Sequence, residues 1–149
     1  MLDNLLNLVR EHAGDAIIRN KAIPDERNEE AIQTTAGGIL DHLKSLAKNG
    51  GKEKIMSLFQ GADPGSNEET RLMSNRIAGT LMNKFGISAA DAGSVVQNLI
   101  PSVMQQFVSK TNDPNDNSFH LQDILKTVLT AKAGGIMGIL GVVMNLFKK

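Results

Sequence analysis

The sequence predicts an all-α protein: one compact bundle of about six or seven short helices with a Gly-rich helix at the C-terminus. Apolar residues recur at helical spacing along almost the whole chain, and no convincing stretch alternates apolar and polar residues with a period of two. The 149 residues match the size of one domain and suffice to bury a core without disulfides or metals. We therefore expect a single domain over 1–149.

Proline and glycine end the expected helices of the first part. The residue before Pro24 avoids the helical backbone region, so the first helix ends ahead of it. The second helix opens with four acidic residues, which suit the positive end of a helix dipole, and an Asn-Gly-Gly sequence ends it. Residues 1–61 are expected to hold helices over about 2–20 and 25–48, and a short helix containing Ile55, Met56, Leu58 and Phe59.

Cap residues and one proline define the helices that follow. Gly86 lies where a left-handed C-cap is expected, and Ser88 with Asp91 resembles a capping box that starts the next helix. Pro101 removes a backbone donor from that helix, so we expect a kink or a division there. After a polar loop at 62–67, residues 68–131 are expected to hold a helix over about 68–85, the helix from Ser88, a polar loop over 111–118 and a helix over about 119–131.

The stretch from Lys84 to Leu125 reads KFGISAADAGSVVQNLIPSVMQQFVSKTNDPNDNSFHLQDIL. It combines a Gly-Ile-Ser helix start, an Ala-rich helix, a Leu-Ile-Pro interruption, an Asp-Pro turn and a Leu-rich helix. With the Gly-rich apolar C-terminus, it resembles the YidB-like family of uncharacterised bacterial proteins over about 84–141. The resemblance implies a small all-helical domain, and no activity, ligand or functional residue. The turn reads Asp-Pro-Asn-Asp where the family usually has Asp-Gly.

Composition argues against several classes of function. The 16 Lys and Arg balance 16 Asp and Glu, so the chain lacks the basic excess of an electrostatic nucleic-acid binder. The absence of Cys removes disulfides, thiolate catalysis and cysteine zinc sites, and leaves the redox compartment open. With no Trp or Tyr and only 5 Phe, little is available for stacking on bases. We expect no nucleic-acid partner.

Catalytic motifs are missing from the sequence. Three histidines fall in separate expected elements and form no metal-binding pair on one helix face. Two pairs of adjacent glutamates fall in the first turns of expected helices, where the helix dipole accounts for them. No nucleophile elbow or phosphate-binding loop occurs, so we expect neither an enzyme nor a cofactor or small-molecule substrate. The three histidines are His12, His42 and His120, and the two glutamate pairs are Glu29 with Glu30 and Glu68 with Glu69.

One polar loop resembles a cation site. Asp113, Asn115 and Asn117 have the spacing of the first ligands of a calcium loop. The twelfth position would be Ile124 in place of the bidentate Glu, with Asp123 one residue early. Because Asn, Asp and Pro are also typical of tight turns, the same residues fit an ordinary turn. These four oxygen-bearing residues are a weak candidate metal site.

The last segment, 132–149, differs from the rest of the chain. Residues 118–149 hold four basic and one acidic side chain, whereas the preceding residues are mildly acidic. Four glycines cost roughly 1 kcal/mol each relative to Ala in a helix interior, so we expect a helix only where something packs against it. Glycine spacing places small residues in a narrow strip beside a broad apolar surface. The expected interaction residues are Gly134, Gly138, Gly141, Ile136, Ile139, Leu140, Val143 and Phe147.

Three roles for residues 133–149 stay open. The segment packs on the protein's own core, associates with a second copy, or lies on a membrane surface where Lys132, Lys148 and Lys149 meet anionic lipid. Its apolar run of about 15 residues is shorter than the about 20 that a spanning helix needs. The first residues lack the features of an export signal, so we expect a cytoplasmic protein.

These observations predict a non-enzymatic helical protein, acting as a structural or protein-interaction module through an apolar helical surface. A protein partner or self-association is expected. Peripheral membrane binding through residues 133–149 is the alternative.

Overall fold

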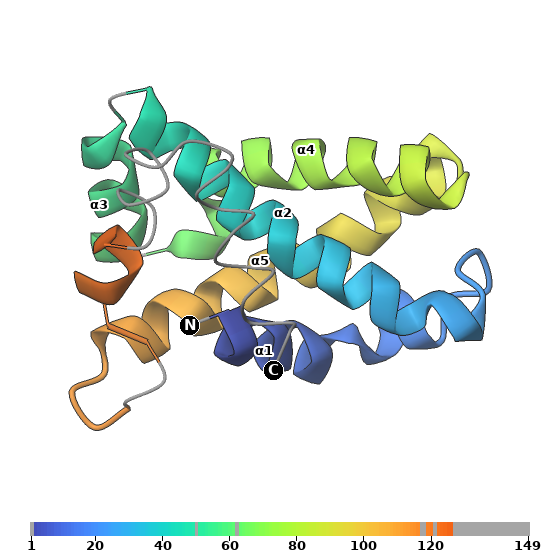
Figure 1. Ribbon diagram of the computed structural model, residues 1–149, viewed down its shortest axis with the longest axis horizontal. Coiled ribbons are helices and arrows are strands. Elements are labelled where there is room, and N and C mark those ends of the chain that lie inside the picture. Colours follow the sequence, from blue (N-terminus) through green and yellow to red (C-terminus); the bar gives the residue numbers. More distant parts are fainter. Residues whose placement is uncertain (1, 50, 62, 117–118, 121, 127–149) are drawn as a thin grey trace, which may run out of the picture.

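The computed structural model confirms the all-α fold. It describes residues 2–49, 51–61, 63–116, 119–120 and 122–126, and no strand occurs among them (Figure 1). The elements are α1 (Leu2–Ala13), the π-helical turn η1 (Gly14–Ile18), the 3-10 turn η2 (Asp25–Arg27), α2 (Asn28–Lys48), α3 (Lys52–Gln60), the 3-10 turn η3 (Pro64–Ser66), α4 (Glu68–Phe85), α5 (Ala89–Asn112) and a short helix at 122–126.

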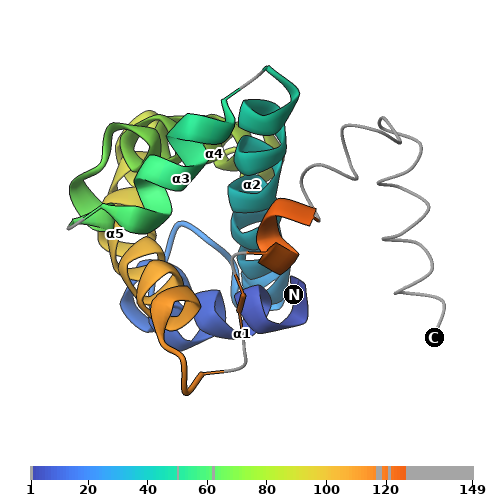
Figure 2. The same ribbon diagram turned by 90° about the vertical axis from the view of Figure 1, so that its left-hand side faces the viewer.

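The long helices pack around a shared core. Figure 1 shows α4 along one long side and α1 along the other, with α2 and α5 between them. α5 contacts α1, α3 and α4, and α2 contacts the same three helices. α3 lies at one end of the bundle, which faces the viewer in Figure 2. None of the described helices has the length and apolar character needed to cross a membrane.

Phenylalanines connect three segments at the end where α3 lies. The Phe59 and Phe107 rings meet edge to face with centroids 5.3 Å apart, and the Phe119 ring lies 4.7 Å from that of Phe107. The Asn112 side-chain amide donates to the Phe59 carbonyl at 2.7 Å. All three rings are buried, so α3, α5 and the segment after α5 share one core.

The first two helices differ from their predicted bounds. The predicted helix at 2–20 is an α-helix only to Ala13, after which the turn widens and the Arg19 N–H donates to the Gly14 carbonyl at 2.9 Å. Gly14 has a low helix propensity and begins this wider turn, while Ala16 and Ile17 stay buried. The second α-helix begins at Asn28, after the 3-10 turn η2.

The predicted caps of the later helices are confirmed. α4 ends at Gly86, which adopts a left-handed conformation with φ of 66° and donates its N–H to the Met82 carbonyl at 3.0 Å. Ser88 caps α5 by accepting a hydrogen bond from the Asp91 N–H at 3.1 Å. A left-handed residue is easiest for glycine because it has no Cβ.

Of the two outcomes expected at Pro101, a kink or a division, the division does not occur. The helix continues from Ala89 to Asn112 with Pro101 in its interior. Pro101 has no N–H to donate to the carbonyl of Gln97, four residues earlier. Because Gln97 is exposed, water can donate a hydrogen bond to that carbonyl. The apolar residues before and after the proline, including Leu99 and Val103, lie in the same core.

Candidate functional site

A close approach of α2 and α4 creates the candidate site. A Cβ atom added to Gly38 would lie 2.6 Å from Cγ1 of Ile77, so α4 packs directly on the α2 backbone at this point. The neighbouring Gly37 has nothing within 4 Å of its Cβ position. One glycine therefore allows the contact, and the other leaves an open surface beside it.

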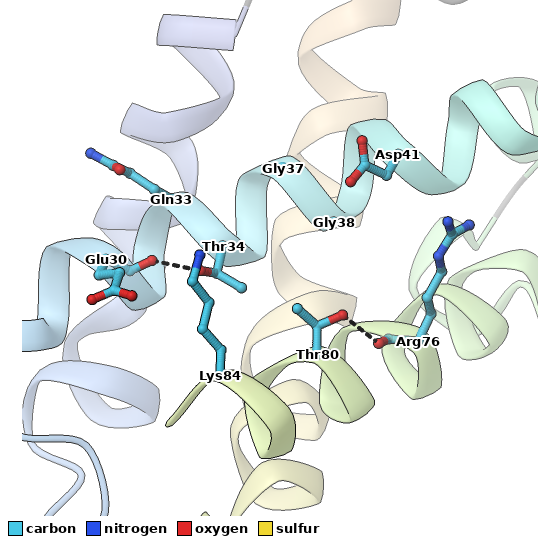
Figure 3. Close-up of a pocket in the computed structure, with 9 residues that line it drawn as sticks. All are labelled: Glu30, Gln33, Thr34, Gly37, Gly38, Asp41, Arg76, Thr80 and Lys84. Atoms are coloured by element: carbon cyan, nitrogen blue, oxygen red, sulfur yellow. Dashed lines mark hydrogen bonds between the residues drawn. The ribbon is translucent and has the colours of Figure 1, made fainter. Parts of the chain in front are cut away.

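Polar side chains line a groove of about 380 Å³ between these helices, which we name the α2–α4 groove (Figure 3). α2 and α4, which form the two walls of the groove, are antiparallel, so the start of α2 lies beside the end of α4. The lining residues are Glu30, Gln33, Thr34, Gly37, Gly38 and Asp41 from α2, and Arg76, Thr80 and Lys84 from α4.

The threonine hydroxyls in the groove bond to their own helices. Thr34 donates to the Glu30 carbonyl at 2.8 Å, and Thr80 donates to the Arg76 carbonyl at 3.2 Å. This back-bonding is a common arrangement for Thr inside a helix. The charged side chains and the amide of Gln33 are therefore the polar groups left to face a ligand.

Arg27 connects α2 to α4 at one end of the groove. Its guanidinium donates to both carboxylate oxygens of Glu30, at 3.2 and 3.1 Å, and to the Lys84 carbonyl at 3.1 Å. It also lies over the Phe85 ring, 4.2 Å from the centroid. The hydrogen bonds from Arg27 hold the pKa of Glu30 below its ordinary value.

The charged residues of the groove form a mixed surface. Figure 3 shows Lys84 reaching toward Thr34 and Glu30 at one end of the groove, and Arg76 facing Asp41 from the opposite wall at the other end. Each end thus carries one acidic and one basic residue. Such a surface suits a polar ligand or polypeptide segment that carries both signs of charge.

A buried ionisable pair lies at the same helix interface. Nε2 of His42 on α2 is 3.8 Å from Oε2 of Glu69 on α4, and the two side chains are 11% and 9% exposed. Neither imidazole nitrogen nor Glu69 Oε2 has a hydrogen-bond partner in the described part of the chain. Burial lowers the pKa of His42, while the Glu69 carboxylate opposes this and the Arg76 charge adds to it.

The helical pattern of the sequence does not predict this pair. From the sequence, His42 has no predicted role, and the helix dipole alone accounts for Glu69. Helical spacing held a signal, because His42 follows buried Ile39 by three residues and Glu69 precedes buried Met73 by four. Both residues therefore belong to core-facing positions.

The candidate cation loop is only partly described. Asp113 Oδ1 accepts a hydrogen bond from the Asn115 N–H at 2.9 Å, which is the geometry of an ordinary Asx turn. Lys110 approaches Asp116 at 3.3 Å. Asp123 lies in the helix at 122–126, and Asn117 lies outside the described residues. Within the described ranges, no three His, Asp or Glu side chains are grouped to hold a metal ion.

The predicted interaction residues of the C-terminal segment lie outside the described residues. They are Gly134, Gly138, Gly141, Ile136, Ile139, Leu140, Val143 and Phe147.

Comparison with protein-family models, curated proteins and solved structures finds no match. The resemblance to the YidB-like family stays a prediction.

Proposed function

We propose that the protein is a non-enzymatic helical interaction module that binds through its apolar C-terminal segment, residues 133–149. The observation that carries this proposal is the polar surface of the described helices. Their large exposed apolar side chains are Ile18, Leu72 and Met82, which are 46%, 39% and 36% exposed. Single apolar residues of this kind are normal on a protein surface.

These three residues do not favour an apolar docking patch on the described surface. Ile18 belongs to η1, whereas Leu72 and Met82 belong to α4. The latter two are ten residues apart, about 15 Å along the helix axis. We therefore assign the apolar interaction surface to residues 133–149, where apolar residues and glycines dominate the sequence.

The partner we propose is a second copy of this chain. The glycine strip permits two backbones to approach closely. Charge adds support, because residues 118–149 carry a net charge of +3 and residues 1–117 carry −3. The basic segment of one copy and the acidic body of another attract each other, although this effect weakens with added salt.

Light scattering on the full chain and on a chain truncated after Lys132 tests the proposal. At tens of micromolar, the full chain is expected to have a mass above that of one copy, and the truncated chain that of a monomer. A folded, truncated chain that still associates would move the interface to the described helices. A monomeric full chain would contradict self-association.

Membrane-surface binding is the second candidate, because lysines flank the apolar run at both ends. Lys132 precedes it, and Lys148 and Lys149 follow it. Flotation with anionic liposomes, with neutral liposomes as the control, separates the candidates. Flotation of the full chain with anionic liposomes, lost on truncation after Lys132, would support this role. If neither chain floats, membrane binding is excluded. A cytoplasmic location is part of both proposals.

A further inference from the structure

Two buried ionisable side chains connect α2 to the first turn of α4. His42 and Glu69 are about nine-tenths buried, and their nearest polar atoms are 3.8 Å apart, beyond hydrogen-bonding distance. Both imidazole nitrogens and one carboxylate oxygen are unpartnered within the described structure. Buried polar groups are normally hydrogen-bonded, so this contact is costly for the fold.

The two residues differ in how well their site accommodates charge. Glu69 is the second residue of α4, where the positive end of the helix dipole stabilises a carboxylate. Its own N–H is also satisfied, because it donates to Oδ1 of the cap residue Asn67 at 2.8 Å. His42 lies inside α2, away from either terminus, and receives no such help.

Charged side chains lie on each of the helices that pack near His42. Asp41 precedes it on α2 and is exposed, while Glu69 and Arg76 reach it from α4. From α3, Glu53 and Lys54 share with Glu69 a second groove of about 520 Å³. α1 also packs on α2, but its Arg10 pairs with Glu29 near the start of that helix. Glu69 and Arg76 are the charges that act on His42, with opposite signs.

We propose that the His42–Glu69 pair makes the contact between α2 and α4 sensitive to acid, closed while His42 is neutral and opened when His42 takes up a proton. A buried imidazolium loses its hydration, and one carboxylate 3.8 Å away, opposed by Arg76, does not replace it. Opening lets water reach the imidazolium. This inference is independent of the C-terminal segment and of the proposed function.

Hydrogen exchange tests the proposal on the full chain. Exchange at pH 7.5 and pH 5.0, corrected for the intrinsic effect of pH, is measured in peptides that cover about residues 38–46 and 66–74. Burial lowers the pKa of His42 in the folded state below its ordinary value of 6.5. As the pH falls from the ordinary pKa of the exposed imidazole to the lower pKa of buried His42, the opening equilibrium is expected to increase up to about tenfold per pH unit. Equal protection at both pH values would overturn the proposal.

Substitutions assign the effect to its residues. His42→Gln removes the titrating group and is expected to abolish the acid response in both peptides. His120→Gln is the matched control, because His120 is exposed, and is expected to keep the response. An unchanged response in His42→Gln would overturn the proposal.

A direct titration covers the case in which His42→Gln does not fold. The His42 imidazole of the wild-type chain, followed by NMR, is expected to titrate below pH 6.5. Glu69→Gln removes the anion that favours protonation and is expected to lower the His42 pKa further. A wild-type His42 pKa at or above 6.5 would contradict the proposal.

Discussion

Ile77 occupies the space that a side chain at Gly38 would need. The distance from a Gly38 Cβ to Ile77 Cγ1 would be 2.6 Å, and to Cδ1 3.2 Å. Cγ1 is bonded to the branched Cβ of a buried side chain, so it has little freedom to move away. The α2–α4 contact, and the groove beside it, therefore depend on a glycine at this position.

Gly38→Ala is expected to destabilise the protein by about 1–3 kcal/mol, because overpacking at Ile77 exceeds the gain in helix propensity. Gly37→Ala is the matched control on the same turn, where the added methyl meets open space. It is expected to stabilise by about 0.5–1 kcal/mol. Urea unfolding of both variants measures the difference. Equal effects of the two substitutions would contradict the close contact.

Arg27→Gln is expected to lower the unfolding free energy by about 0.5–1 kcal/mol through the loss of its cation–π contact with Phe85. The change also removes a two-point interaction with Glu30. Arg71→Gln is the control, since the Arg71–Glu68 pair is 61% and 76% exposed. If Arg27→Gln lowers the unfolding free energy no more than Arg71→Gln does, Arg27 does not stabilise the contact between α2 and α4.

Asn112→Ala is expected to cost about 0.5–1.5 kcal/mol, because it removes the hydrogen bond to the Phe59 carbonyl that joins α5 to α3. Asn98→Ala on the same helix serves as a control, because Asn98 is exposed and makes only a 3.5 Å contact with Ser94. Thermal unfolding of the two variants provides the comparison. If both variants melt like the wild type, the Asn112 bond contributes nothing to stability.

Calcium is expected to leave the melting temperature unchanged. Asp113 already accepts from the Asn115 backbone, as in an ordinary turn. The measurement compares millimolar Ca²⁺ with a chelator, since a ligand that binds only the folded state raises its stability. A melting temperature that rises with Ca²⁺ would instead assign a metal site to the loop.

Helix existence and caps could be predicted from the sequence because they depend on local chemistry. Gly86 and Ser88 lie at helix ends in the predicted roles, since a left-handed C-cap and a serine N-cap involve only neighbouring residues. Pro101 was harder, because its effect depends on whether the freed carbonyl reaches water. The sequence does not show that exposure directly.

The sequence did not predict the His42–Glu69 pair or the α2–α4 groove. These features join residues 27 or more positions apart, and helical spacing gives the face of each helix without its partner. Gly38 shows the same limit: its close contact is with Ile77, whereas Gly37 has open space. Only the packing of α2 on α4 distinguishes the two glycines.

Sedimentation equilibrium of the full chain tests the proposed self-association most directly. Between about 1 and 50 µM, a range that brackets micromolar dissociation constants, the full chain is expected to rise above the 16.0 kDa of one copy. Ile139→Asp with Val143→Asp, which places charge in the apolar segment, is expected to return the mass to 16.0 kDa while the helical circular dichroism of the body persists. A full chain that sediments at 16.0 kDa throughout would contradict the account.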